Sequence, residues 1–167
     1  ALKIKSKWDG KVLLVTLDHP VDFSIDVQGD GMHPLHVFTD SPETDIPDSS
    51  DPNLIYFGPG VHDIDQIVLK SNQTLYLEAG AILRPNPAKI PNQKVVIRGV
   101  EFDRGDAMIK ITDADNVTIK GKGIITSSRA IENYTKSPVI QAVRTKNLII
   151  QDVLLMESNA WNIHIHS

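Results

Sequence analysis

One pattern recurs along the second half of this chain and constrains its fold more than any other feature. The segment NVTIKG at 116–121 aligns with NLIIQD at 147–152, and the same offset aligns MIKI at 108–111 with VIQA at 139–142. We call this paired match, of 108–121 with 139–152, the long repeat. Each match contains a short β-branched run, and the two matches lie on either side of a bend. A chain that repeats strand, corner and strand in this way can stack successive turns about 4.8 Å apart, as in a parallel β-helix.

Similar strands recur upstream at irregular spacing. The last core-facing aliphatic residues of four successive runs are Leu77, Ile97, Ile119 and Ile150, and the longest interval is the last. Variable spacing suits a coil whose loops differ in length while its strands stay stacked, so we expect these side chains to stack inside, with the extra residues of the long coil in a polar loop at 127–136. An antiparallel sandwich or barrel is the alternative, but two-residue hairpin loops are scarce after residue 60.

Two asparagines hold equivalent positions before their strands. Asn116 and Asn147 each precede an aliphatic run and are equivalent in the long repeat. Asparagine tolerates a left-handed backbone, and its amide can bond to main-chain groups of neighbouring coils where no strand ladder reaches. These residues are therefore predicted to be structural corner residues.

The first part of the chain differs from the rest. Residues 1–40 contain short alternating runs and an Asp9-Gly10 turn signal, which together predict a small antiparallel, sandwich-like β module. Residues 41–52 are rich in proline and acidic residues and are predicted to be a linker, while 53–167 would form β-helix coils. The predicted fold is all-β, with a right-handed parallel β-helix after the antiparallel module.

Composition excludes several classes of function. The formal net charge of -4, without a basic block, argues against nucleic acid as a partner, and no apolar run approaches the roughly 20 residues of a membrane span. The absence of cysteine excludes disulfides and thiolate metal sites. No glycine-rich loop has the strand–loop–helix context of a phosphate site, so no cofactor is expected.

Three segments resemble glycoside hydrolase family 28, the polygalacturonase-like family of pectin-lyase-like β-helices. They are LKSNQTLYLEAGAIL at 69–83, NVTIKGKGII at 116–125 and SNAWNIH at 158–164, in the order in which the family's coils follow one another. The segment IYFGPGVHDI at 55–64, behind a β-rich module, is also similar to glycoside hydrolase family 49, the dextranases and isopullulanases. The resemblance implies a secreted or periplasmic enzyme that hydrolyses a pectic or glucan polysaccharide, most simply a uronate-containing one, by acid–base catalysis with inversion.

The family's catalytic segments do not occur in this sequence. The Asn-Thr-Asp, Asp-Asp and Gly-His-Gly segments and the later Arg-Ile-Lys of family 28 have no counterpart, so no catalytic residue is assigned. We therefore expect an N-terminal portion of a longer enzyme that ends within a coil and is inactive alone. The alternatives are a non-catalytic glycan-binding β-helix of adhesin or tailspike type, and a polysaccharide lyase.

The last segment supplies the candidate binding residues. Asn162, His164 and His166 alternate along a predicted strand and point to one side, and Trp161 beside them could stack on a sugar ring. The two histidines lack a third ligand, so no metal site is assigned. Four aspartates at 103, 106, 113 and 115 are expected to be solvated corner residues. Ile163 and Ile165 would lie at an uncovered coil edge, which predicts self-association through this end.

Overall fold

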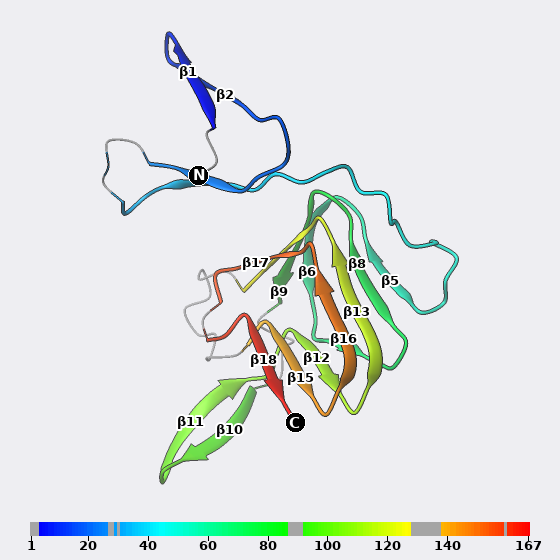
Figure 1. The fold of residues 1–167 in the computed structure, drawn as a ribbon. Coiled ribbons are helices and arrows are strands. Elements are labelled where there is room, and N and C mark those ends of the chain that lie inside the picture. The colour runs from blue at the N-terminus through cyan, green and yellow to red at the C-terminus, as the bar shows by residue number, and fades with distance from the viewer. Residues whose placement is uncertain (1–3, 27–28, 30, 87–91, 128–137, 159) are drawn as a thin grey trace. The chain divides into compact units, whose positions relative to one another are not determined.

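The chain folds into two compact units without helices among the described residues (Figure 1). The computed structural model describes residues 4–26, 29, 31–86, 92–127, 138–158 and 160–167. The units comprise Ala1–Thr44 and Asp45–Ser167. The division lies in the proline-rich acidic segment.

The N-terminal unit consists of two antiparallel strand pairs. Strands β1 (Lys5–Asp9) and β2 (Val12–Thr16) form one two-stranded sheet, and β3 (Phe23–Ile25) and β4 (Leu35–Val37) form another. Gly10 follows Asp9 with a φ of 61°, as the turn signal predicts. None of the described residues of this unit is buried, because such short strands cover little apolar surface. The antiparallel strands are present, but a sandwich core does not form among the described residues.

The second unit is a parallel β-helix of three four-stranded sheets. The first sheet consists of β5 (Leu54–Phe57), β8 (Thr74–Leu77), β13 (Asp115–Gly121) and β16 (Lys146–Gln151). The second sheet consists of β6 (Gly60–Ile64), β9 (Ala81–Pro85), β14 (Ile124–Thr126) and β17 (Leu154–Met156). The third sheet consists of β7 (Ile67–Leu69), β12 (Ile109–Thr112), β15 (Ile140–Val143) and β18 (Ile163–His166). Every neighbouring pair in these sheets is parallel. The predicted β-helix is thereby confirmed.

The register of the strands confirms the long repeat. Ile109 pairs with Ile140 in the third sheet, and Ile119 pairs with Ile150 in the first. The next coil in the third sheet is shorter, since Ile140 pairs with Ile163. The predicted polar loop at 127–136 lies outside the described residues except for Ser127, which is buried.

The predicted position of Ile97 in the stack is wrong. Ile97 ends β10 (Asn92–Ile97), which pairs antiparallel with β11 (Val100–Gly105), and Figure 1 shows this hairpin projecting from the stacked strands. Arg98 and Gly99 form its turn with φ angles of 50° and 80°. In the β-helix, where β13 pairs with β8, Ile119 is paired with Leu75 and Gly121 is paired with Leu77. A short β-branched run looks alike in a hairpin and in a coil, which explains the error.

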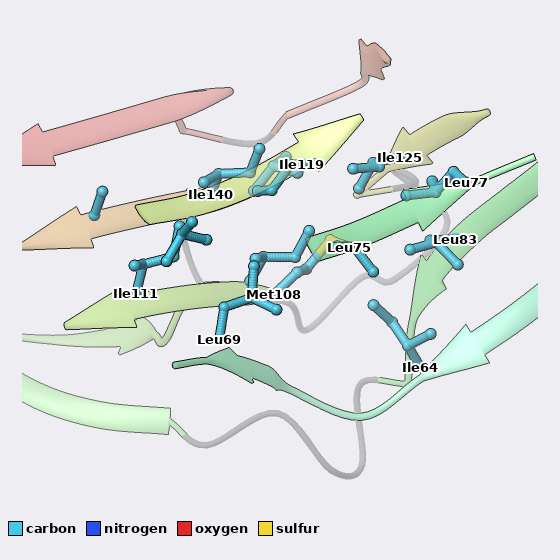
Figure 2. Close-up of a cluster of buried hydrophobic side chains, with 14 of the residues drawn as sticks. Ile64, Leu69, Leu75, Leu77, Leu83, Met108, Ile111, Ile119, Ile125 and Ile140 are labelled. Atoms are coloured by element: carbon cyan, nitrogen blue, oxygen red, sulfur yellow. The ribbon is translucent and has the colours of Figure 1, made fainter. Parts of the chain in front are cut away.

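The core is a column of aliphatic side chains inside the three sheets (Figure 2). Its fully or almost fully buried members include Leu69, Leu75, Leu77, Leu83, Met108, Ile109, Ile111, Ile119, Ile125 and Ile140. They come from strands of all three sheets, so the inward positions of each strand fill the space between sheets. The alternate positions of the same strands then face outward.

A ladder of asparagines lines one corner of the β-helix. Asn72, Asn116 and Asn147 have φ angles of 66°, 58° and 53°, in the left-handed region. Asn116 Nδ2 donates to Asn72 Oδ1 at 3.1 Å, and Asn147 Nδ2 donates to Asn116 Oδ1 at 2.9 Å. The predicted corner role is confirmed for Asn116 and Asn147, although these bonds join side chains rather than side chain and main chain.

We expect Asn116→Ala to lower the free energy of unfolding by about 2 kcal/mol, which corresponds to a fall in Tm of about 4–8 °C. Alanine disfavours the left-handed backbone and removes both ladder bonds of Asn116. Asn116→Gly removes the same bonds but tolerates the backbone, so its loss should be smaller. Urea unfolding of both variants tests this, and an alanine variant as stable as the wild type would contradict the ladder's structural role.

Candidate functional site

The outer face of the sheet β7–β12–β15–β18 carries the candidate site. Strand alternation turns Ile109 and Ile140 into the core, so the next residue of each strand points outward. The strand register aligns these outward positions as a row, which consists of Val68, Lys110, Gln141 and His164. Adjacent members of the row stand about one strand spacing apart, close to 4.8 Å.

Aromatic rings gather at the β18 end of this row. The Trp161 ring stacks on that of His164, with ring centroids 5.4 Å apart and planes 28° apart. The His166 ring lies 6.5 Å from that of His164 at a tilt of 36°. Trp161 remains 56% exposed, so one large part of its surface is open to a ligand. The structure therefore places three of the four predicted binding residues together.

The fourth predicted residue, Asn162, has a structural contact through its backbone. Its carbonyl oxygen accepts a hydrogen bond from Ile140 N–H at 3.0 Å, and its side chain is exposed. Asn162 precedes β18 and stands at the corner where the chain enters the sheet. The carbonyl oxygen of its neighbour Trp161 accepts a similar hydrogen bond from Val139 N–H at 3.0 Å.

A hydrogen bond links the aromatic cluster to the adjacent strand. Gln141 Nε2 lies 3.4 Å from His164 Nδ1. When this amide donates, Nδ1 accepts, and the neutral imidazole carries its proton on Nε2. The face then offers both a ring N–H and an amide oxygen for hydrogen bonds to a ligand.

A partly buried ion pair lies further along the same face. Asp106 Oδ2 lies 2.7 Å from Lys110 Nζ, and the side chains of these residues are 8% and 29% exposed. Asp106 Oδ1 also accepts from Ala107 N–H at 2.9 Å, and Gln66 Nε2 donates to the Ala107 carbonyl at 2.8 Å. The expectation that Asp106 is a solvated corner residue is wrong, because the start of β12 folds its side chain against these groups.

The protonation state of Asp106 follows from these contacts. Burial acts to raise its pKa, but hydrogen bonds from Lys110, Gln66 and the Ala107 N–H outweigh burial and hold the pKa below its usual value. The carboxylate therefore stays ionised at neutral and mildly acidic pH. A general acid needs a raised pKa, so Asp106 is suited to hold Lys110 rather than to donate a proton.

The other predicted aspartates differ in setting. Asp113 forms a paired contact with Arg144, from Nε at 2.5 Å and from Nη2 at 2.6 Å, at an exposed corner. Asp115 accepts a hydrogen bond from Lys146 N–H at 3.0 Å. The side chain of Asp103 lies outside the described ones. The expected corner position is thus found for Asp113 and Asp115.

Sequence reasoning missed Lys110 and Gln141 as members of the site. The signal was present, because the long repeat aligns Lys110 with Gln141, and the shorter offset of the next coil aligns Gln141 with His164. Combining the two offsets would have predicted the row. The environment of Asp106 had no such signal, since it depends on the backbone path at a corner.

The described residues offer neither a metal-binding cluster nor a membrane-spanning helix. No group of three or more histidine, cysteine, aspartate or glutamate side chains within the described ranges could hold a metal ion. Among those residues no helix is long and apolar enough to cross a membrane. The groups that the site does present are the aromatic rings of Trp161, His164 and His166 and the hydrogen-bonding side chain of Gln141. Such surfaces suit ligands with apolar faces and many hydroxyl groups.

Comparison with known proteins supports the fold. No protein-family model and no curated protein sequence matches this chain. A crystal structure from Parabacteroides merdae ATCC 43184, described as a "putative glycosyl hydrolase", is similar with a TM-score of 0.54 and 22% sequence identity. The similarity covers 68% of this chain and 54% of that protein, so the chain spans about half the length of its structural neighbour. At this identity the likeness establishes a shared fold.

Proposed function

We propose that this chain is part of a glycoside hydrolase and that the outer face of β7–β12–β15–β18 binds a polysaccharide. The observation that carries the proposal is the exposed Trp161 ring, held in a stack with His164 at the end of a row of hydrogen-bonding side chains. The structural neighbour described as a "putative glycosyl hydrolase" supports the enzyme class. For the whole protein we further propose hydrolysis of a pectic or glucan polysaccharide with inversion, as in the polygalacturonase-like family that the sequence resembles, in a secreted or periplasmic setting.

Different residues of the site would bind different parts of a sugar unit. Trp161 offers an apolar surface for the face of a sugar ring, while His164 and Gln141 offer hydrogen bonds to hydroxyl groups. An inverting hydrolase needs two carboxyl groups about 6.5–9.5 Å apart, one of them protonated. Asp106 is ionised and paired with Lys110, so we assign this face to binding rather than to bond cleavage.

We expect Trp161→Ala to weaken polysaccharide binding about 30-fold, which corresponds to roughly 2 kcal/mol for the loss of a central aromatic contact. The chain has two tryptophans, so a Trp8→Phe background leaves Trp161 as the single fluorescent tryptophan. Titration of this background with dextran, pullulan and polygalacturonate should change its emission. Affinity electrophoresis in the same glycans then compares wild type with the Trp161→Ala variant.

Trp8→Ala is the matched control for this substitution. Trp8 is 64% exposed on β1, similar to Trp161, but belongs to the N-terminal unit. Its replacement should leave glycan migration unchanged, and thermal unfolding should show that both variants remain folded. Equal retardation of wild type and the Trp161→Ala variant would show that this face is not the glycan site.

The pairing of Asp106 with Lys110 also favours a second candidate function. A carboxylate occupied in this way suits a non-catalytic glycan-binding β-helix of adhesin or tailspike type. Assays on the full-length protein separate the possibilities. A hydrolase releases reducing ends, a polysaccharide lyase releases unsaturated products, and a binding module releases neither.

A further inference from the structure

Charged groups around the candidate site balance in number. Within three residues of β7, β12, β15 and β18, the described residues comprise four acids and four bases, which are Asp65, Asp106, Asp113, Asp115, Lys70, Lys110, Arg144 and Lys146. With histidine neutral, their formal charge is zero. Among these described residues there is therefore no surplus of the positive charge that attracts a polyanion.

The cation in the outward row is already neutralised. Lys110 stands between Val68 and Gln141 in this row, and its ammonium group contacts the Asp106 carboxylate at 2.7 Å. To pair with a ligand carboxylate, Lys110 would have to leave Asp106, whose side chain is 8% exposed. Asp106 would then keep its hydrogen bonds from Ala107 N–H and Gln66 but lose its counter-charge at a largely buried position. That loss is unfavourable, so the exchange opposes anion binding.

A second ion pair limits positive charge at the edge of the face. Arg144 contacts Asp113 through two nitrogen atoms, at 2.5 and 2.6 Å. The side chains of Gln141, His164 and His166, which lie near Trp161, can form hydrogen bonds with uncharged hydroxyl groups and need no ionic partner to do so. Charge and hydrogen-bonding capacity thus point to the same class of ligand.

On the basis of the proposed function, we infer that this face selects an uncharged polysaccharide over a polyuronate at neutral to mildly alkaline pH. Two features discriminate against the polyanion. The counted acidic and basic residues cancel in charge, and Lys110 is already paired with Asp106. The stacking and hydrogen-bonding side chains can bind an uncharged polysaccharide as well as a polyuronate, so they do not offset this discrimination. This narrows the expected pectic or glucan ligand to the glucan type.

The test compares dextran and pullulan with polygalacturonate at about pH 8, above the range in which histidine side chains generally carry a proton. Wild type should bind an uncharged glycan more tightly, with little dependence on salt. Asp106→Asn removes the carboxylate and releases Lys110, so affinity for polygalacturonate should rise about fivefold at low salt and return toward the wild-type value at high salt. Affinity for the uncharged glycan should stay within about twofold.

Asp63→Asn is the matched control. Asp63 pairs with Arg84 at 2.8 Å on the sheet β6–β9–β14–β17, so this variant changes net charge equally and releases a cation on another sheet. It should not gain affinity for polygalacturonate. An equal gain in both variants would overturn the inference, because net charge alone would then explain the effect.

The outcomes separate the two proposals. Absence of binding to every glycan would contradict the proposed function itself. Tightest wild-type binding to polygalacturonate, falling steeply with salt, would overturn the charge inference while leaving the proposed function intact. The wild-type salt titration decides the inference even if the Asp106→Asn variant fails to fold.

Discussion

Replacing Gly121 with alanine is expected to prevent the chain from folding at 37 °C, or to lower its free energy of unfolding by more than about 4 kcal/mol. Gly121 ends β13 against Leu77 of β8, with a φ of +124°. A Cβ atom at this position would lie 2.0 Å from the Leu77 carbonyl oxygen and 2.8 Å from its carbonyl carbon. The Leu77 backbone cannot move away, because its carbonyl accepts from Lys122 N–H at 2.9 Å and its side chain is fully buried.

Gly99→Ala provides the matched control for this prediction. Gly99 has a φ of +80° in the β10–β11 turn, but an added Cβ would meet no atom within 4 Å. The free energy of unfolding of this variant should fall by only about 1 kcal/mol, because alanine disfavours the positive φ that glycine tolerates. Expression yield, circular dichroism and urea unfolding compare the two variants. Equal stability of both would contradict the close packing of β13 on β8.

The second large effect is expected for Ile119→Ala, which should lower the free energy of unfolding by about 3 kcal/mol. Ile119 is fully buried and stands between Leu75 and Ile150 in the first sheet. Its truncation leaves a cavity between three coils that the surrounding strands cannot close. Urea unfolding of the purified variant measures the loss.

Ile149→Ala controls for the loss of an isoleucine on the same sheet. Ile149 is adjacent to Ile150 but lies on the outer face and is 49% exposed. Its truncation should lower the free energy of unfolding by less than about 1 kcal/mol. If the two variants lost equal stability, Ile119 would not lie in the stack.

The long repeat was predictable because it combines two strands and a corner. Residues that recur together at one offset must occupy equivalent places in successive coils, as the pairing of Ile109 with Ile140 shows. A single short run has no such constraint. The run ending at Ile97 met the strand pattern but turns back at Arg98 and Gly99, so the coil before Ile119 is longer than predicted.

The site was predictable where strand alternation determines it. His164 and His166 share a face because they are two residues apart on β18, and this required only the strand assignment. The burial of Asp106 was not predictable in the same way. It follows from the path of the chain into β12, where Ala107 N–H, Gln66 and Lys110 meet the carboxylate.

Glycan binding at the outer face of β7–β12–β15–β18 is tested most directly by an NMR titration of the tryptophan indole N–H signals with dextran and pullulan. Trp161 and Trp8 give one indole signal each, and Trp8→Phe assigns them. We expect the Trp161 signal to shift in a saturable manner, together with the ring signals of His164, while the Trp8 signal stays in place. Saturable binding that leaves the Trp161 and His164 signals unmoved would contradict glycan binding at this face.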